Sequence, residues 1–444
     1  MNMKITLLSL LIMISVAAFA QDENKTINKS GFNFGFLPTI SYDADMGFQY
    51  GALVNVFDYG KGNFYPDYKQ QWKVEVSRYT GGSGVNQFFY DAKHVLPKNI
   101  RLTADLSYFT EQALDFYGFN GYQANYITDY VDKEADDYIS RVFYKVDRKL
   151  FRFTLDFQGK LYGNHLRWLG GLAIMNYKMG AVDIDAINKK KSEDKQLPDT
   201  ISLYDIYTEN NLLSAEERDG GQVNFLKTGL VYDTRDQEAN ASKGIWSEAF
   251  LVYAPKVFTD RSQSFAKLVA IHRQYFTLVP NKLTFAYRLG YQGTIGGKAP
   301  YYFQPYMLTS FSTVTKTDGL GGAKNLRGII RDRVVGDGIA YGNAELRWKF
   351  LKTKIGKQNI YVALNTFLDA GMVVQNIEVN KDLEQYSEYN LFNTTFTNDG
   401  LHPSAGAGLR IALNENFILA VDYGFAMNKN DGLKGLYINI GNLF

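Results

Sequence analysis

Side chains able to carry out covalent or metal chemistry are scarce in this chain of 444 residues. The absence of cysteine excludes a disulfide framework, an iron–sulfur cluster, a cysteine zinc site and a cysteine nucleophile. The four histidines, His94, His165, His272 and His402, have no nucleophile motif beside them, and no Gly-x-Ser-x-Gly turn occurs. We therefore predict that the protein is not an enzyme and holds neither a metal ion nor a cofactor.

Glycine-rich and charged segments offer no stronger site. The segments 81–84 and 319–322 lack the Lys-Ser/Thr pair and the strand-to-helix setting of phosphate-binding loops. The basic run 189–195 and the acidic run 132–137 are typical of solvated loops, with anionic sugars and divalent cations as the alternative ligands. The formal charge of +2 gives no electrostatic reason to expect nucleic-acid binding.

The first 20 residues have the pattern of a secretory signal peptide. A single lysine precedes an apolar core, and Ala18-Phe19-Ala20 supplies the small residues of a cleavage site. We expect the mature chain to begin at Gln21 and to be exported to the bacterial outer membrane. Residues 21–30 then form a short periplasmic segment, and residues 31–444 form a single domain. No later stretch is apolar enough for a helical membrane span.

Alternation of apolar and polar residues is the recurring pattern of this domain. Between Asn359 and Asp369, the even-numbered residues form one apolar face and the odd-numbered residues a mixed polar face. This period of two fits either a soluble sandwich or a membrane barrel. Uninterrupted strands, aromatic residues near strand ends and the terminal strand ending in Phe444 favour the barrel.

The pattern predicts an all-β fold, a transmembrane barrel of sixteen antiparallel strands. The expected strands are 32–42, 47–58, 70–80, 86–96, 100–110, 138–161, 167–180, 223–234, 244–255, 264–277, 281–293, 339–350, 359–369, 403–413, 416–427 and 434–443. With both termini in the periplasm, the long segments 111–137, 181–222, 294–338 and 370–402 all fall outside. Long outer loops and short inner turns are the asymmetry expected of such a barrel.

Four stretches give the sequence a resemblance to a known family. They are GLVYDTRDQEANASKG (229–244), GGAKNLRGIIRDRVVGDG (321–338), FLDAG (367–371) and PSAGAGLRIAL with VDYGFA (403–426). In this order they resemble the BamA/TamA superfamily of outer-membrane assembly and translocation barrels, also described as bacterial surface antigens. The second stretch is similar to the family's sixth outer loop, with Ile329 where the usual residue is aromatic. No periplasmic POTRA domain fits before residue 31.

The resemblance implies a role in protein insertion or protein translocation at the outer membrane. The implied partners are outer-membrane lipid and lipopolysaccharide, together with other assembly proteins or a secreted polypeptide, and the barrel is expected to be monomeric. A non-enzymatic channel or a structural accessory subunit without assembly activity is the alternative. No nucleic acid is expected among the partners.

Within this resemblance, Arg327 is the main candidate functional residue. The sixth outer loop is expected to fold into the lumen, where a guanidinium would bind a carboxylate through two parallel hydrogen bonds. Asp369 lies on the polar face described above, and Glu345 shares a face with neighbouring polar residues of its strand, so both are candidate partners. Gly328 would let the backbone approach the wall or adopt a positive φ.

A second candidate region is the closing strand. Gly441 is expected inside this strand, where glycine weakens the ladder and permits a kink at the seam between the first and last strands. Ordinary packing of a small residue is the alternative explanation. Phe444 is expected to continue a lipid-facing row with Ile440, Ile438 and Leu436 as the terminal signature of a barrel.

Overall fold

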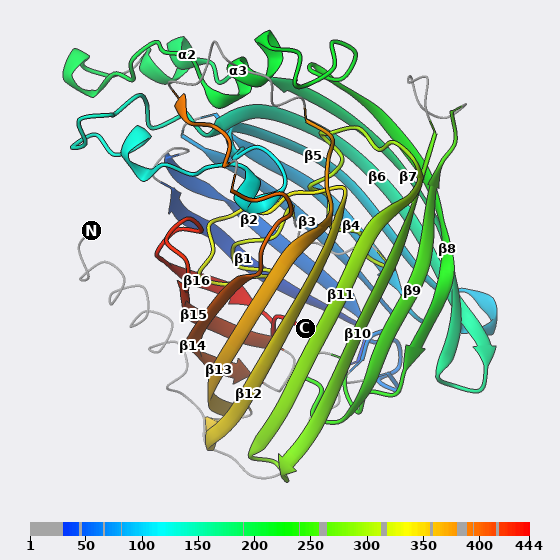
Figure 1. The fold of residues 1–444 in the computed structure, drawn as a ribbon. Coiled ribbons are helices and arrows are strands. Elements are labelled where there is room, and N and C mark those ends of the chain that lie inside the picture. The colour runs from blue at the N-terminus through cyan, green and yellow to red at the C-terminus, as the bar shows by residue number, and fades with distance from the viewer. Residues whose placement is uncertain are drawn as a thin grey trace.

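A computed structural model of the chain describes twelve ranges of residues. They are 30–43, 47–64, 67–80, 82–189, 191–238, 240–256, 264–311, 318–355, 358–379, 389–393, 395–413 and 417–444. The expected signal peptide at 1–20 and nearly all of the segment 21–30 lie outside these ranges. The described strands curl into a barrel whose long connections gather at one end (Figure 1).

One antiparallel sheet holds all sixteen named strands of the described residues, each paired with its neighbours in chain order. The strands are β1 (Phe32–Asp43), β2 (Gly47–Asp58), β3 (Gln70–Tyr79), β4 (Gly84–Ala92), β5 (Arg101–Asp115), β6 (Lys145–Tyr162), β7 (Leu166–Gly180), β8 (Gly220–Asp233), β9 (Gly244–Ala254), β10 (Phe265–Val279), β11 (Leu283–Gly297), β12 (Gly338–Ile355), β13 (Gln358–Gln375), β14 (His402–Leu413), β15 (Phe417–Ala426) and β16 (Lys434–Ile440). The predicted barrel fold and the order of its strands are confirmed.

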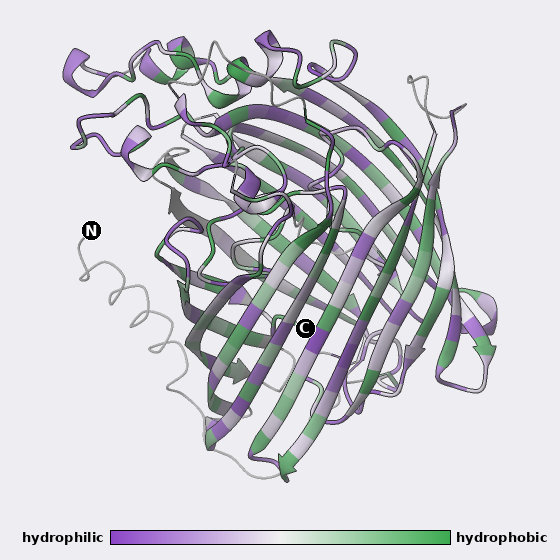
Figure 2. Ribbon diagram, viewed as in Figure 1, coloured by the Kyte–Doolittle hydropathy of each residue, from purple (hydrophilic) through white to green (hydrophobic). Residues whose placement is uncertain are grey.

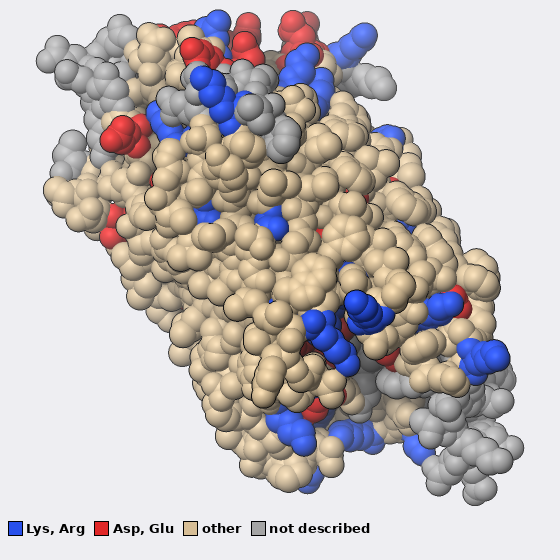
Figure 3. Space-filling model, turned by 90° about the vertical axis from the view of Figure 1, so that its right-hand side faces the viewer, with Lys and Arg blue, Asp and Glu red and all other residues tan. Residues whose placement is uncertain are grey.

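The strands alternate between a buried polar face and an exposed apolar face, as Figure 2 shows by its banded colouring. On β13, Asn365 and Asp369 are buried, whereas Leu368 is 60% exposed. The apolar face therefore points outward and the polar face inward, which distinguishes a membrane barrel from a soluble sandwich. On the flank seen in Figure 3, charged side chains gather toward the two ends, and the band between them carries few. No helix of the described residues is long and apolar enough to cross a bilayer.

The sheet has two edges, β1 and β16, and no hydrogen-bonded ladder joins them within the described residues. This differs from a fully closed barrel, in which every strand edge is paired. Phe34 and Phe36 on β1 are more than two-thirds exposed, and outward apolar side chains of other strands, such as Leu368 at 60%, are exposed as well. Unpaired backbone N–H and C=O groups along two such edges form a template for an added strand. We call this place the seam.

Connections differ greatly between the two ends of the barrel. At the long-loop end, the described residues of the segments 116–144, 181–219, 298–337 and 376–401 include α2 (Ile184–Asn188), α3 (Leu203–Glu209), η2 (Gly121–Gln123), η3 (Thr128–Tyr130) and η4 (Glu193–Lys195). At the short-turn end, connections such as η1 (Pro97–Asn99) contain only a few residues. The expected asymmetry between long and short connections is thus present.

Several predicted strand boundaries differ from the structure: β4 ends at Ala92 instead of residue 96, β5 at Asp115 instead of residue 110, and β13 at Gln375 instead of residue 369. Two further differences have a local cause. The strand predicted from residue 138 begins at Lys145, because Val142, Phe143 and Tyr144 belong to the preceding loop and are buried there. β16 ends at Ile440 instead of residue 443. Both differences arise where local packing or backbone conformation overrides a continuing apolar pattern.

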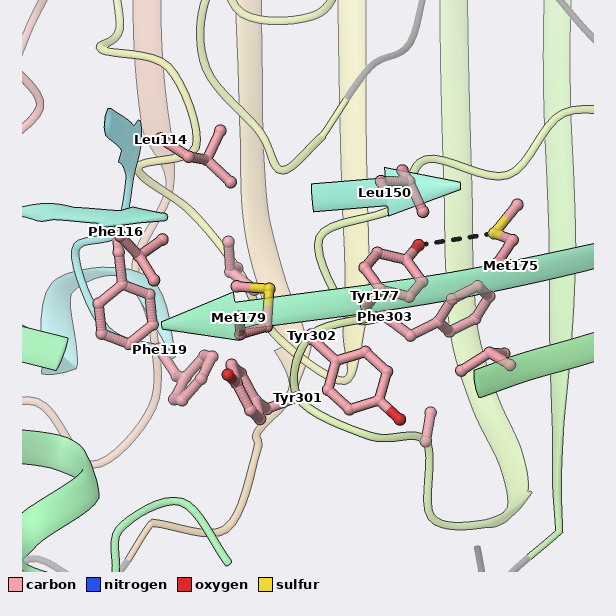
Figure 4. Packing of buried hydrophobic residues seen from close by; sticks show 14 of the residues in the cluster. Leu114, Phe116, Phe119, Leu150, Met175, Tyr177, Met179, Tyr301, Tyr302 and Phe303 are labelled. Atoms are coloured by element: carbon pink, nitrogen blue, oxygen red, sulfur yellow. Dashed lines mark hydrogen bonds between the residues drawn. The ribbon is translucent and has the colours of Figure 1, made fainter. Parts of the chain in front are cut away.

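An aromatic cluster fills the barrel toward the long-loop end. Phe116 packs edge-to-face against Tyr207 of α3, and Phe303 of the β11–β12 loop packs against Phe225 of β8 and Phe265 of β10. Figure 4 shows Phe303 lying near the wall residues Met175 and Tyr177 of β7. Large apolar contact areas hold the loops to the β5–β11 side of the barrel.

Candidate functional site

The β11–β12 loop enters the lumen and carries the main candidate site. Its described residues are 298–311 and 318–337. Leu320, Leu326, Ile329 and Val334 are fully buried and form one cluster with wall residues of β12 and β13. Apolar burial therefore holds the loop inside the barrel and brings Arg327 against the wall.

Arg327 forms a bidentate ion pair with Asp369 of β13. Its Nε donates to Asp369 Oδ2 at 2.9 Å, and its Nη2 donates to Asp369 Oδ1 at 3.0 Å. The backbone N–H of Arg327 adds a third hydrogen bond to Oδ2 at 3.1 Å. Both side chains have no solvent exposure. Such a fork fixes the direction of the loop as well as its position.

The same guanidinium contacts two further carboxylates and one ring. Arg327 Nη1 donates to Glu345 Oε1 of β12 at 2.7 Å and approaches Asp422 Oδ2 of β15 at 3.5 Å. Its carbon Cζ lies 3.6 Å from the centre of the Phe367 ring. One loop side chain is thereby tied to three of the last five strands, of which β15 is the neighbour of the edge strand β16.

Charges in this cluster balance one for one. Glu345 also pairs with Arg347 at 2.7 Å, and Asp422 pairs with Arg410 at 2.8 Å. The three cations are Arg327, Arg347 and Arg410, and the three anions are Glu345, Asp369 and Asp422. Because each of these six charges has an opposite partner, removing one member leaves another uncompensated.

Gly328 brings the loop backbone into direct contact with β15. Its φ is +100°, and an added Cβ would lie 2.6 Å from the backbone nitrogen of Phe425. Gly424 shows the reciprocal approach, because its Cβ would lie 2.7 Å from the carbonyl carbon of Arg327. The N–H of Gly328 also donates to Tyr437 Oη of β16 at 3.0 Å. The loop thus touches the edge strand itself.

The residues predicted for the seam lie along and after β16. Leu436 and Ile438 are more than 60% exposed and form the expected outward row. Ile440 ends the strand, and its side chain lies outside the described part. Gly441 follows the strand instead of lying inside it, with a φ of +88° and an N–H that donates to the carbonyl of Ile418 at 2.8 Å.

Phe444 does not continue the lipid-facing row, so this expectation is wrong. The centre of its ring lies 6.3 Å from the centre of the Tyr275 ring. The same ring centre lies 5.2 Å from Cζ of Arg288 and 5.0 Å from Cζ of Arg347. Arg347 Nη2 also donates to the Phe444 carbonyl at 2.9 Å. These three partners are buried lumen residues. The positive φ of Gly441 turns the last residues inward, which residue alternation alone does not indicate.

The structure therefore brings Arg327, Gly328, Asp369 and Glu345 together. Sequence reasoning missed Asp422 and Gly424, although both lie in the 421–426 stretch that supported the resemblance. Asp422 is buried on the lumen face, and alternation along β15 would have found it. Within the described residues, no group of three or more His, Asp or Glu side chains could hold a metal ion.

An outward apolar face, an inward polar face and a long loop anchored in the lumen define a transmembrane β-barrel with an inserted loop. The chain belongs to the Omp85 superfamily, whose domain model matches residues 69–444. Membership places the barrel in the bacterial outer membrane and its activity, at family level, in insertion or translocation there. Comparison with curated protein sequences finds no match.

Two solved structures have a similar fold. BamA from Haemophilus ducreyi lacking POTRA domains 1-3 is 14% identical, with a TM-score of 0.51 over 93% of this chain and 69% of that one. CdiB from Escherichia coli is 11% identical, with a TM-score of 0.52 over 93% of this chain and 61% of that one. The chain thus spans about two-thirds of the length of these proteins. At such low identity, the likeness shows a shared fold.

Proposed function

We propose that this barrel inserts or translocates polypeptides at the outer membrane, using its seam as the working surface. The observation that carries the proposal is the pair of unpaired edges, β1 and β16, beside a loop that is anchored on β12, β13 and β15. A polypeptide in extended conformation could add to either edge by main-chain hydrogen bonds.

In this proposal, Arg327 holds the β11–β12 loop as a plug and as a brace for the seam. Gly328 and Tyr437 join the loop to β16, so a shift of the loop is transmitted to the edge strand. Gly441 follows β16, and its backbone freedom allows the residues after the strand to move independently of it. The role is mechanical and non-enzymatic, and it needs no cofactor.

Partners follow from the same surface. The exposed apolar row on the strands contacts outer-membrane lipid, and the long-loop end lies among lipopolysaccharide head groups. The polypeptide at the seam is either a secreted chain or a client barrel delivered by other assembly proteins. The barrel works as a monomer, because its own edges are the binding surface.

Reconstitution tests this function directly. Purified barrel in lipid vesicles should increase the membrane insertion of an added unfolded outer-membrane protein, measured by protease protection and heat-modifiable gel mobility. Because the chain has no cysteine, a bifunctional thiol crosslinker that joins Phe34→Cys to Ile438→Cys should lock the seam and abolish the gain. The matched control links Leu226→Cys to Tyr253→Cys, which are partners on the paired strands β8 and β9.

A channel or accessory subunit is the second candidate, favoured by the loop that the Arg327 cluster anchors in the lumen. It predicts no insertion above empty vesicles and ionic conductance that changes with Arg327 variants. Insertion that is equal with and without the crosslink at the seam would contradict the proposed use of the edges.

A further inference from the structure

A second buried ionic cluster lies at the long-loop end, away from Arg327. At its centre is His402, the first residue of β14, whose side chain has no solvent exposure. Nδ1 of His402 lies 2.7 Å from Asp431 Oδ1, and Nε2 lies 3.0 Å from Asp399 Oδ1. Each ring nitrogen thus faces a carboxylate oxygen.

The contacts of His402 indicate how many protons the histidine and the two carboxyl groups hold together. An ionised carboxylate only accepts hydrogen bonds, so two contacts of this kind require an N–H on both ring nitrogens or a proton on one carboxyl group. A neutral ring between two ionised carboxylates would turn one nitrogen lone pair toward an oxygen lone pair. The cluster therefore holds one proton more than a neutral histidine and two aspartates.

The other groups around His402 do not supply this proton. The ring of Tyr122 stacks on His402 at 3.8 Å, and its Oη donates to Asp431 Oδ2 at 2.7 Å. Burial and the hydrogen bond to Asp431 raise the pKa of Tyr122 above its usual range, so this hydroxyl remains a donor. Arg333 Nε lies 3.8 Å from Asp431 Oδ1 and is the other cation facing the cluster within the described residues. Two cations therefore balance two aspartates only when His402 is charged.

The cluster joins four separate segments over the lumen. Asp399 precedes β14, Asp431 lies between β15 and β16, Tyr122 belongs to the β5–β6 loop, and Arg333 belongs to the β11–β12 loop. Asp399 also accepts the backbone N–H groups of Tyr122 and of Val373 on β13. Arg333 donates to the carbonyls of Gly121 and Ala124 at 3.0 and 2.9 Å. We call these joined loop segments the lid.

We propose that the Asp399–His402–Asp431 cluster is a proton-dependent latch that keeps the lid closed over the long-loop end of the barrel. The charged ring bridges two loops at low and neutral pH. When pH rises and the extra proton leaves, one contact becomes repulsive and the four segments separate. Because this end faces the medium, the latch responds to external pH, independently of any polypeptide at the seam.

Single-cysteine labelling tests the latch in the full-length barrel in lipid vesicles. Ala124→Cys places a thiol at a lid position that is 2% exposed, in a chain that has no other cysteine. Its rate of reaction with a methanethiosulfonate reagent is divided by that of the exposed Ser192→Cys, which removes the intrinsic pH dependence of thiols. From about pH 5 to about pH 9, the ratio should rise roughly tenfold with one midpoint.

Matched histidine variants identify the group that titrates. In His402→Gln, the ratio should be high at every pH and the midpoint should disappear. In His165→Gln, a change at an exposed histidine of the β6–β7 turn, the midpoint should be unchanged. The proposal would be overturned by a labelling ratio that does not change with pH when residue 402 is histidine. It would also be overturned by a midpoint that persists in His402→Gln.

A second measurement does not require the variant to fold. In wild-type barrel labelled with ¹⁵N-histidine, the buried ring of His402 should show two slowly exchanging N–H signals at low pH. The pH at which one of them is lost must coincide with the midpoint of labelling. Loss at a different pH would contradict the latch, and heat-modifiable gel mobility verifies that each labelled sample is a folded barrel.

Discussion

The two sides of the lumen hold their loops by different physical means. On the β5–β11 side, loop residues such as Phe116 and Phe303 bury aromatic rings against the wall. On the β12–β16 side, one arginine is held by carboxylates of β12, β13 and β15. Apolar packing is non-directional and tolerates changes of similar volume, whereas a bidentate ion pair depends on the exact partner. The specific attachment is therefore the one that lies beside the seam.

The largest effect is expected from Arg327→Ala. This change leaves the buried carboxylates of Asp369 and Glu345 without the cation that they share. We therefore expect a loss of about 3 to 5 kcal/mol from the free energy of unfolding, measured by denaturant titration in lipid vesicles. Arg327→Ala with Asp369→Ala should cost less than the sum of the single changes. Arg331→Ala, in the same loop but with a side chain 44% exposed, is the control and should cost about 1 kcal/mol or less. Equal losses for the two variants would contradict the claim that the buried ion pairs of Arg327 contribute more to stability than the exposed pair of Arg331.

Conservative changes on the two sides compare them directly. Arg327→Lys keeps the charge but loses the fork, and we expect a cost of about 1.5 to 3 kcal/mol in the same titration. Phe303→Leu on the aromatic side keeps an apolar side chain of related volume and should cost about 1 kcal/mol. If the leucine variant proved the more damaging, the proposed difference between the two sides would be wrong.

Gly328→Ala tests the contact between loop and edge strand. The added Cβ would meet the backbone of Phe425, which cannot move without disturbing β15, so we expect a cost of about 1 to 3 kcal/mol. Gly322→Ala is the matched control, because this glycine of the same loop also has a positive φ, +84°, but its nearest neighbour would be 3.4 Å away. Planar-bilayer recordings should show more frequent current fluctuations for the first variant than for the second. Identical behaviour would mean that backbone strain, and not the contact with β15, is responsible.

The smallest effect is expected at the short-turn end. Phe444→Ala removes the ring beside Arg288 and Arg347 but leaves both cations in place, so we expect a loss of about 0.5 to 1 kcal/mol in the same unfolding titration. Removal of a lipid-facing terminal signature would instead impair insertion into the membrane. Unchanged stability with a large drop in the amount of folded barrel would therefore favour the lipid-facing interpretation over the inward contact.

Much of this architecture could be predicted from residue order alone. Period-two alternation identifies the faces of the strands, and it predicts that Asp369 and Glu345 lie on the polar faces of their strands. Alternation fails where the chain leaves the sheet. The apolar residues 142–144 continue the pattern of β6 yet pack inside a loop, and the turn at Gly441 depends on a positive φ that many glycines never adopt. The His402 cluster cannot be predicted from alternation for another reason, because all four of its partners come from loops whose meeting is set by tertiary packing.

The one-for-one charge balance around Arg327 has a consequence for permeation. If the loop leaves the lumen, Arg327 leaves the cluster, and Arg347 and Arg410 remain facing Glu345, Asp369 and Asp422. The wall at this place then becomes more negative by about one charge, which favours cations over anions in an aqueous path. Release of the loop should thus shift the selectivity of the barrel toward potassium over chloride, and its reversal potential in a salt gradient would report which state the loop is in.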